Sequence, residues 1–171
     1  MEGQQASDPQ RGKSLYWAAI VALMLGLTAL FQGVSRNERV AQSVLTTEGK
    51  VALVLTRQRD GHYYAEGKIN GGAVAFLVDT GASDVALSSD AARTLGLDFG
   101  PEITVMTAAG PVRGWMTRLE HIQVGPLALR NVRATITDKL GEQALLGMSF
   151  LKNFSMIQEG DTLILAVAGE T

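Results

Sequence analysis

The chain has 171 residues, a formal net charge of −2 and no cysteine. This length accommodates about one domain with an appended segment. The lack of cysteine excludes disulfides, thiol catalysis and a lipidated N-terminal cysteine, and the balanced charge without a basic block argues against nucleic-acid binding.

An apolar segment near the N-terminus, from Leu15 to Phe31, predicts a membrane-spanning helix. At ~1.5 Å per residue it would be roughly 26 Å long, near the lower limit for crossing a bilayer. Tyr16 and Trp17 at its leading edge suit a membrane interface. We therefore expect a cytoplasmic tail over residues 1–14, an anchor over 15–34, a linker over 35–48 and a folded domain over 49–168.

Two alternatives for this segment remain open. Gly33-Val34-Ser35 could be the cleavage site of a signal peptide, although the apolar stretch is long for one. A buried core helix is less consistent with the pattern, because no polar face interrupts the run. Charge leaves the orientation nearly undecided, since two basic residues precede the segment and two follow it: Arg11 and Lys13, then Arg36 and Arg39.

From residue 51 onward, short runs of Val, Leu, Ile and Thr alternate with turn residues, which predicts an all-β domain. Asn70-Gly71-Gly72 is a strong hairpin signal, because Asn and Gly accept positive φ at little cost. Ser88 or Ser89 can cap a short helix that runs through Leu95, with Gly96 at its C-terminal end. The expected strands cover residues 51–56, 62–69, 73–78, 103–107, 112–120, 121–124, 127–132, 134–137, 155–159 and 162–167, with a second short helix over 149–153.

The segment Phe76–Ser83 reads Phe-Leu-Val-Asp-Thr-Gly-Ala-Ser, an apolar strand that carries Asp79 into a tight turn. Asp-Thr-Gly alone also occurs in ordinary hairpin turns, but the apolar residues before it and Ala-Ser after it favour a catalytic turn. Some 65 residues downstream comes Leu145-Leu146-Gly147, an apolar segment whose glycine would let two backbones approach closely.

Together, these two motifs resemble those of the retropepsins, the single-domain aspartic proteases of retroviruses and their bacterial relatives. The resemblance covers roughly residues 49–168 and is particularly marked for bacterial membrane-anchored members. It implies a closed β-barrel of the acid-protease half fold, preceded by one transmembrane helix. It also implies that Leu145, Leu146 and Gly147 support the catalytic turn from behind, and that the tail lies inside and the domain outside the inner membrane.

Peptide hydrolysis by this chemistry uses two carboxylates around one water, which share a proton when about 3 Å apart. The chain carries one Asp-Thr-Gly, so an active enzyme requires a homodimer with Asp79 from each copy at the two-fold axis. We expect the Thr80 hydroxyl to reach across that axis and Gly81 to leave room for the substrate backbone. No cofactor is needed.

The resemblance also indicates residues that would contact a peptide substrate. Ala82 would keep the pocket wall small, and Ser83 and Asp84 occupy positions that touch substrate in retroviral relatives. For Asp84, a solvated turn that caps local N–H groups is an equal alternative. The predicted flap tip is Ala108, Ala109 and Gly110, although retroviral flaps are richer in glycine than this segment.

Other residues that could carry a function are better explained by structural roles. Trp115 could line a pocket, but a large aromatic residue on a strand is more often part of the core. His62 and His121 are isolated, so we predict no metal site. The competing functions are a catalytically silent module that binds a peptide or protein on a membrane anchor, and a purely structural β-domain.

Overall fold

The computed structural model describes residues 42–47, 50–107 and 110–167, which belong to one compact unit running from Val40 to Thr171. The predicted tail, anchor and membrane segment, together with Ala108 and Ala109 of the flap tip, lie outside the described residues. Among the helices that are described, none has both the length and the apolar character needed to cross a bilayer.

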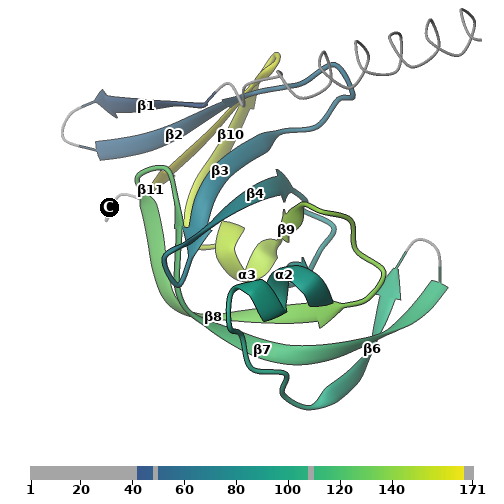
Figure 1. The fold of residues 1–171 in the computed structure, drawn as a ribbon. Helices are drawn as coiled ribbons and strands as arrows, with labels where there is room; N and C mark the ends of the chain where they lie inside the picture. Colours follow the sequence, from purple (N-terminus) through teal and green to yellow (C-terminus); the bar gives the residue numbers. More distant parts are fainter. Residues whose placement is uncertain (1–41, 48–49, 108–109, 168–171) are drawn as a thin grey trace, which may run out of the picture. The chain divides into compact units, whose positions relative to one another are not determined.

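The larger sheet closes on itself. Its strand order is β3-β4-β9-β5-β8-β7-β6, and β3 also pairs with β7, which closes six strands into a barrel and leaves β6 attached outside it (Figure 1). The predicted all-β barrel fold is therefore confirmed. The strands are β3 (Tyr64–Ile69), β4 (Gly72–Val78), β5 (Val85–Ser88), β6 (Glu102–Thr107), β7 (Gly110–Val124), β8 (Leu127–Thr137) and β9 (Ala144–Leu146).

Closure depends on a glycine at the point where β3 meets β7. Gly67 pairs with Val124, and a Cβ on Gly67 would lie 2.2 Å from the carbonyl oxygen of Gln123. Only glycine therefore allows the two strands to approach this closely. The barrel interior is filled by fully buried apolar side chains, which include Phe76, Leu87, Leu119, Ile122, Ile136, Leu146 and Phe150.

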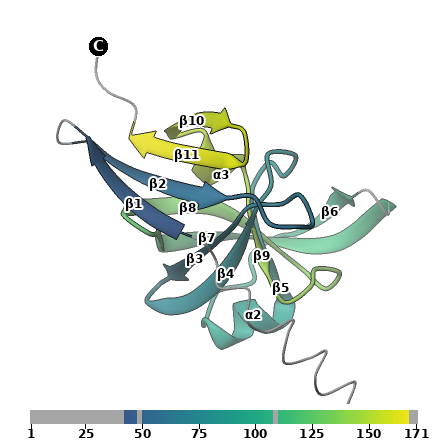
Figure 2. The ribbon, with the colours of Figure 1, turned by 90° about the horizontal axis from the view of Figure 1, so that it is seen from above.

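A second, four-stranded sheet has the order β1-β2-β11-β10 and is antiparallel throughout (Figure 2). Its strands are β1 (Gln42–Thr47), β2 (Lys50–Thr56), β10 (Phe154–Glu159) and β11 (Thr162–Val167). One face joins the core through Leu53, Leu55, Leu163 and Leu165. β1 corrects the prediction of a linker over residues 35–48, because Gln42–Thr47 pairs along its whole length with β2.

Several predicted boundaries differ from the structure. The strands expected at 112–120 and 121–124 are one strand, β7, and those at 127–132 and 134–137 are one strand, β8, because each pairs with the other almost from end to end. The charged residues that interrupt the apolar runs point outward from long strands. The capped helix is confirmed as α2 (Ser89–Thr94), whose N-cap Ser88 accepts from the Ala91 N–H, and α3 covers Met148–Leu151.

The turn between β2 and β3 supplies a pH-dependent contact. The hydroxyl of Tyr64 donates to the Asp60 carboxylate and, with the backbone N–H of His62, holds the pKa of Asp60 below its ordinary value. Since the folded state lowers this pKa, the contact stabilises the fold above the pKa of the unfolded chain and is lost as pH falls through the folded pKa.

We therefore expect Tyr64→Phe to raise the pKa of Asp60 towards its ordinary value, because the largest cause of the shift is removed. NMR titration of the Asp60 carboxyl carbon in both proteins measures this change directly. An unchanged pKa would show that the Tyr64 hydroxyl does not hold this carboxylate in solution.

Candidate active site

Asp79 follows directly on β4, and backbone contacts hold it in a tight turn. Its N–H donates to the carbonyl oxygen of Leu146 at 3.2 Å, and its own carbonyl accepts from the N–H of Ala82 at 3.3 Å. The backbone N–H of Gly81 donates to the Asp79 Oδ1 at 2.8 Å, which orients the carboxylate. Asp79 is half-buried, while Thr80 and Gly81 are exposed in the single chain.

Besides the predicted role of leaving room for the substrate backbone, Gly81 leaves room for the Asp79 carboxylate. A Cβ at this position would lie 3.1 Å from the Asp79 Oδ1, closer than ordinary van der Waals contact. A side chain on residue 81 would therefore crowd the carboxylate that its own amide holds. The close approach gives a local reason for glycine here, independent of any substrate.

The segment Leu145-Leu146-Gly147 lies against the turn that carries Asp79. β9 runs parallel to β4, with Leu145 opposite Leu77 and Leu146 opposite Val78. At Gly147 the backbones nearly touch, because a Cβ there would lie 2.1 Å from the carbonyl oxygen of Asp84 and 2.7 Å from that of Ala82. Any residue could adopt the φ of −89° found at Gly147. Glycine is therefore needed here because a side chain would not fit, and not because of the backbone conformation.

The start of α3 continues this support. The N–H groups of Met148 and Ser149 donate to the carbonyl oxygens of Ala82 and Ser83, at 2.8 and 2.9 Å. First-turn N–H groups have no partner within their own helix, so they are available to bind the carbonyls of the active-site loop. The loop after Asp79 is thus tied to a helix start that lies about 65 residues away in the sequence.

Ser149 and Arg133, which the sequence analysis did not single out, also support the Asp79 turn. The Ser149 hydroxyl accepts from the N–H of Val85 at 2.9 Å and donates to the carbonyl oxygen of Arg133 at 2.8 Å. Ser149 therefore joins α3, β5 and β8 behind the catalytic turn. The available signals were the single polar residue in the apolar start of α3 and the basic Arg133 between Val132 and Ala134.

We expect Ser149→Ala to lower the free energy of unfolding by about 1–3 kcal/mol, because the N–H of buried Val85 would lose its acceptor. Denaturant titration of the full chain measures this loss. A midpoint equal to that of the unmodified protein would mean that water replaces the hydroxyl and that Ser149 is not a structural bridge.

Asp84 is engaged within the protein. Its Oδ1 accepts from the Nε of Arg133 at 2.7 Å, and the side chains are 18% and 52% exposed, respectively. The sequence left two interpretations of Asp84 open, contact with substrate and capping of local N–H groups in a solvated turn. The ion pair with Arg133 adds a third, in which Asp84 anchors the loop to β8. Of the other predicted substrate residues nearby, Ala82 is half-buried and Ser83 is exposed.

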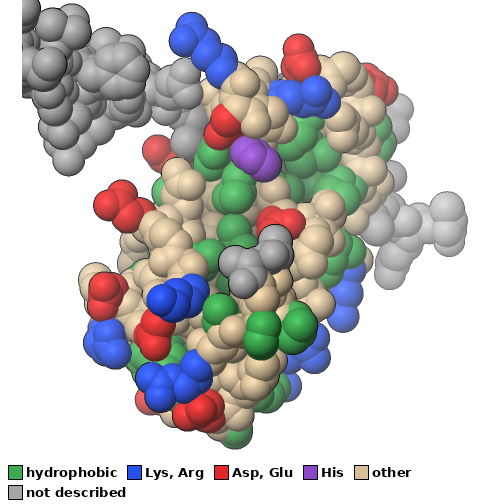
Figure 3. Space-filling model, turned by 90° about the vertical axis from the view of Figure 1, so that its right-hand side faces the viewer, with side chains coloured by type: hydrophobic (Ala, Val, Ile, Leu, Met, Phe, Trp, Pro, Cys, Tyr) green, Lys and Arg blue, Asp and Glu red, His purple; other side chains and the backbone are tan. Residues whose placement is uncertain are grey.

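The predicted flap is the hairpin of β6 and β7, in which Val105 pairs with Val112 and Thr107 with Gly110. Gly110 adopts a φ of 106°, a left-handed value that glycine accepts readily. Figure 3 shows the face that carries this hairpin, where hydrophobic side chains run along the middle together with an acidic one and a histidine, and most other charged side chains lie towards the edges.

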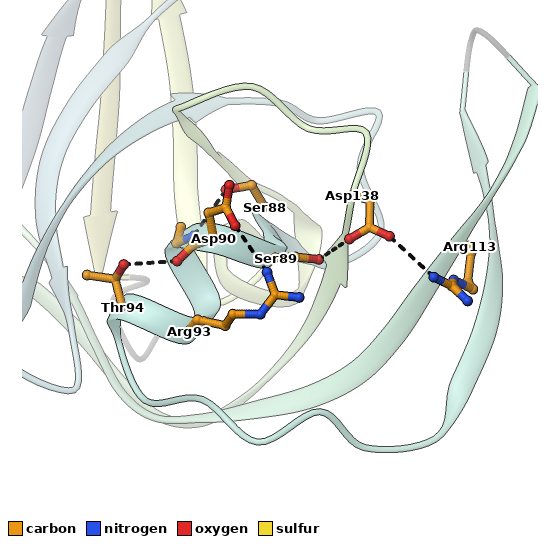
Figure 4. A network of polar contacts seen from close by, with 8 residues as sticks. Ser88, Ser89, Asp90, Arg93, Thr94, Arg113 and Asp138 are labelled. Carbon is orange, nitrogen blue, oxygen red and sulfur yellow. Dashed lines mark hydrogen bonds and ion pairs between the residues drawn. The ribbon is translucent and has the colours of Figure 1, made fainter.

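Aromatic and polar contacts brace the base of the flap. Trp115 packs against the core, with its ring 5.4 Å from that of Phe99, which supports the core interpretation of Trp115. The guanidinium of Arg113 lies over the Trp115 ring and 3.7 Å from the Asp138 carboxylate, which also accepts from the Ser89 hydroxyl (Figure 4). This network joins the flap strand β7 to α2.

In residues 42–47, 50–107 and 110–167, no three His, Cys, Asp or Glu side chains gather in a way that could hold a metal ion. The Asp79 carboxylate lies in a turn that β9 and the start of α3 brace.

Comparison with known proteins matches this architecture. A family model described as "gag-polyprotein putative aspartyl protease" matches residues 65–153, a stretch that holds the Asp79 turn, the flap hairpin and Gly147. The chain belongs to the retropepsin-like aspartic protease family. A solved retropepsin-like aspartic protease from Rickettsia conorii is similar over 67% of this chain and 98% of its own, with 33% identity and a TM-score of 0.59.

Two curated relatives of this retropepsin-like chain are also similar. A Sinorhizobium protein described as "uncharacterized protein in cobV 5′ region" is 38% identical over 122 residues, which is 69% of this chain and 52% of that protein. The protein RP867 of Rickettsia prowazekii, described as uncharacterized, is 32% identical over 117 residues, or 66% and 50% of the two chains. The chain therefore spans about half the length of the curated relatives it matches.

Proposed function

We propose that this retropepsin-like protein is an aspartic endopeptidase that is active as a homodimer. The observation that carries the proposal is the Asp79 carboxylate, oriented by the Gly81 amide in a turn that β9 and α3 hold from behind. Aspartic-protease chemistry needs two such carboxylates, and the sequence contains one Asp-Thr-Gly, so two copies are required.

In the dimer, the two Asp79 side chains would flank one water molecule. The ionised carboxylate takes a proton from the water as its oxygen attacks the scissile carbonyl carbon, and the protonated one hydrogen-bonds the carbonyl oxygen as the carbon becomes tetrahedral. The proton then passes to the leaving amine as the C–N bond breaks. Thr80 and Gly81 are exposed in the single chain, as residues that meet a partner or a substrate would be.

We also propose that residues 15–34 anchor the protein in a bacterial inner membrane, with the protease domain in the periplasm. The charge-free apolar run and its leading Tyr16 and Trp17 support this. Confinement to a membrane raises the local concentration, so a weak dimer interface would suffice. Its substrates would then be exposed segments of other envelope proteins.

The activity is tested with the full chain in a mild detergent and a mixed peptide library, with products read by mass spectrometry. We expect cleavage that is absent in Asp79→Ala and that rises faster than linearly with enzyme at low concentration, because dimerisation precedes catalysis. Cleavage that persists in Asp79→Ala would contradict the proposal. A folded dimer that binds peptides without cutting them would instead support a silent binding module.

The proposed membrane anchoring and periplasmic location of the domain are tested separately, with alkaline phosphatase fused to the C-terminus in a Gram-negative host. This reporter is active only outside the cytoplasm, so high activity in the membrane fraction is expected. Activity in the soluble fraction would indicate a cleaved signal peptide, and an inactive fusion would place the domain in the cytoplasm.

A further inference from the structure

Two arginine side chains lie next to each other on the surface of the barrel. Arg118 of β7 is directly opposite Arg133 of β8, and both residues are exposed. The row continues to Asp84, which precedes β5 and accepts from the Arg133 Nε at 2.7 Å. Since β5, β8 and β7 are neighbours in the sheet, these three side chains lie on one line across it. Two guanidinium groups therefore share one carboxylate.

Both guanidinium groups are held in position, yet neither is fully used. The Arg118 Nη1 donates to the backbone carbonyl oxygen and to the Oδ1 of Asn131, at 3.2 and 3.1 Å. Asp84 occupies only the Nε of Arg133, and within the described residues nothing binds the two terminal nitrogens of that side chain or pairs Glu120 of β7 with either arginine. Like charges directly opposite each other on antiparallel strands destabilise a sheet. The pair therefore has both the charge and the free donors to bind a further anionic group.

The neighbouring row on the same face is largely apolar and lies beside the flap hairpin. Side chains two residues apart on a strand share a face, so Met116, Thr135 and Ala86 lie next to the charged row. Val105 of the flap strand β6 projects over this face, since a Cβ on Gly114 would lie 2.8 Å from the Val105 Cγ2 and 3.4 Å from the Thr135 Cγ2. The two arginines therefore border an apolar surface that the flap strand and the barrel form together.

This apolar surface leads to the catalytic turn. Ala86 pairs with Leu145 of β9, and the next residue of β9, Leu146, accepts from the Asp79 N–H at 3.2 Å. β8 is two strands away from β9, roughly 10 Å at the usual strand spacing, which an extended peptide covers in about three residues. A peptide whose scissile bond lies at Asp79 could therefore place a nearby side chain against the two arginines.

We propose that Arg118 and Arg133 form a subsite for an acidic side chain of the substrate. The protease then selects peptide segments that carry Asp or Glu within about three residues of the scissile bond. Arginine suits this task because its planar group presents paired donors that match the two oxygens of a carboxylate. The two arginines determine specificity and take no part in the chemistry. This inference deepens the proposed function and rests on it.

The subsite is tested with the full chain in mild detergent and with pairs of peptides that differ at one residue. In a peptide that the library experiment shows to be cut, each position near the scissile bond is replaced in turn by Glu and by Gln. At one position we expect kcat/KM to be at least about tenfold higher for Glu than for Gln. High salt should reduce this ratio, because exposed charges are screened. A ratio near one at every position would overturn the proposal.

Variants of the chain then assign the preference to the two arginines. Arg118→Gln and Arg133→Gln should each lower the Glu-to-Gln ratio by at least about threefold. A purely structural loss would lower kcat/KM for both peptides and leave their ratio unchanged. Arg118→Glu should reduce the ratio further and favour a peptide with Lys at the same position.

The matched control is Arg130→Gln, which removes an exposed arginine nearer the other end of β8 and should keep the ratio of the unmodified chain. An equal loss of preference in Arg130→Gln and Arg118→Gln would mean that the overall charge of the domain attracts acidic peptides. The proposed subsite would then be wrong.

Peptide binding separates this inference from the proposed activity. The Asp79→Asn chain should not cut, so fluorescence anisotropy with labelled peptides that carry Glu or Gln measures their dissociation constants alone. Tighter binding of the Glu peptide that disappears when Arg118→Gln is added would support the subsite even if the unmodified chain cut no peptide. Cleavage without discrimination between Glu and Gln would contradict the subsite and leave the proposed activity standing.

Discussion

Replacing Asp79 with asparagine is expected to reduce kcat by at least about a thousandfold while the fold is retained. The amide has nearly the shape of the carboxylate and can still accept from the Gly81 N–H, so the turn should persist. It can neither take the proton from water nor hold a negative charge. Cleavage of a peptide identified in the library experiment measures the loss, with circular dichroism as the check on folding.

The matched control is Asp98→Asn, an exposed aspartate outside the site, which should retain full activity. Co-expression of equal amounts of unmodified and Asp79→Asn chains adds a sharper test. If each active site takes one Asp79 from each copy, random pairing leaves only about a quarter of the dimers intact. Activity near half of the unmodified value would instead mean that each chain works alone.

Replacing Gly147 with alanine is expected to lower the free energy of unfolding by about 3 kcal/mol and to abolish most activity. The added methyl group would lie 2.1 Å from the Asp84 carbonyl oxygen, a backbone atom that cannot swing aside as a side chain can. Relief requires that either the loop of residues 82–84 or the start of α3 moves. Both movements disturb the support of Asp79.

Gly141→Ala is the matched control, because a Cβ at that position meets nothing within 4 Å and the backbone is not left-handed. Denaturant titration of the two variants separates the effect of space at Gly147 from a general glycine effect. If Gly147→Ala is as stable and active as Gly141→Ala, the close approach behind the catalytic turn does not exist in solution.

Local sequence signals predicted much of the fold. The Asn70-Gly71 hairpin, the Ser88 cap of α2 and the apolar strand before Asp79 each depend on neighbours in the chain. Such features are determined by backbone preference and by alternation of apolar residues, so they can be read from one sequence. The approach of Gly147 to the turn was predicted through the family resemblance.

Other features depend on partners far away in the sequence and could not be predicted in this way. β1 lies in a polar stretch without clear alternation and becomes a strand because β2 pairs with it. β5 is only four residues long and pairs with β8 and β9 inside the barrel. The contact between Asp84 and Arg133 joins residues 49 positions apart, and no local pattern announces it.

The sequence by itself therefore predicted an all-β domain, a candidate catalytic aspartate and, from its single Asp-Thr-Gly, a requirement for a second copy, because a motif and its count are local facts. Only the tertiary structure decided how the turn is held, with Ser149 and Arg133 behind it, and which of the described strands lie at the sheet edges. Those features follow from which surfaces the closed barrel brings together. That outcome is set by long-range pairing and packing and not by any single segment.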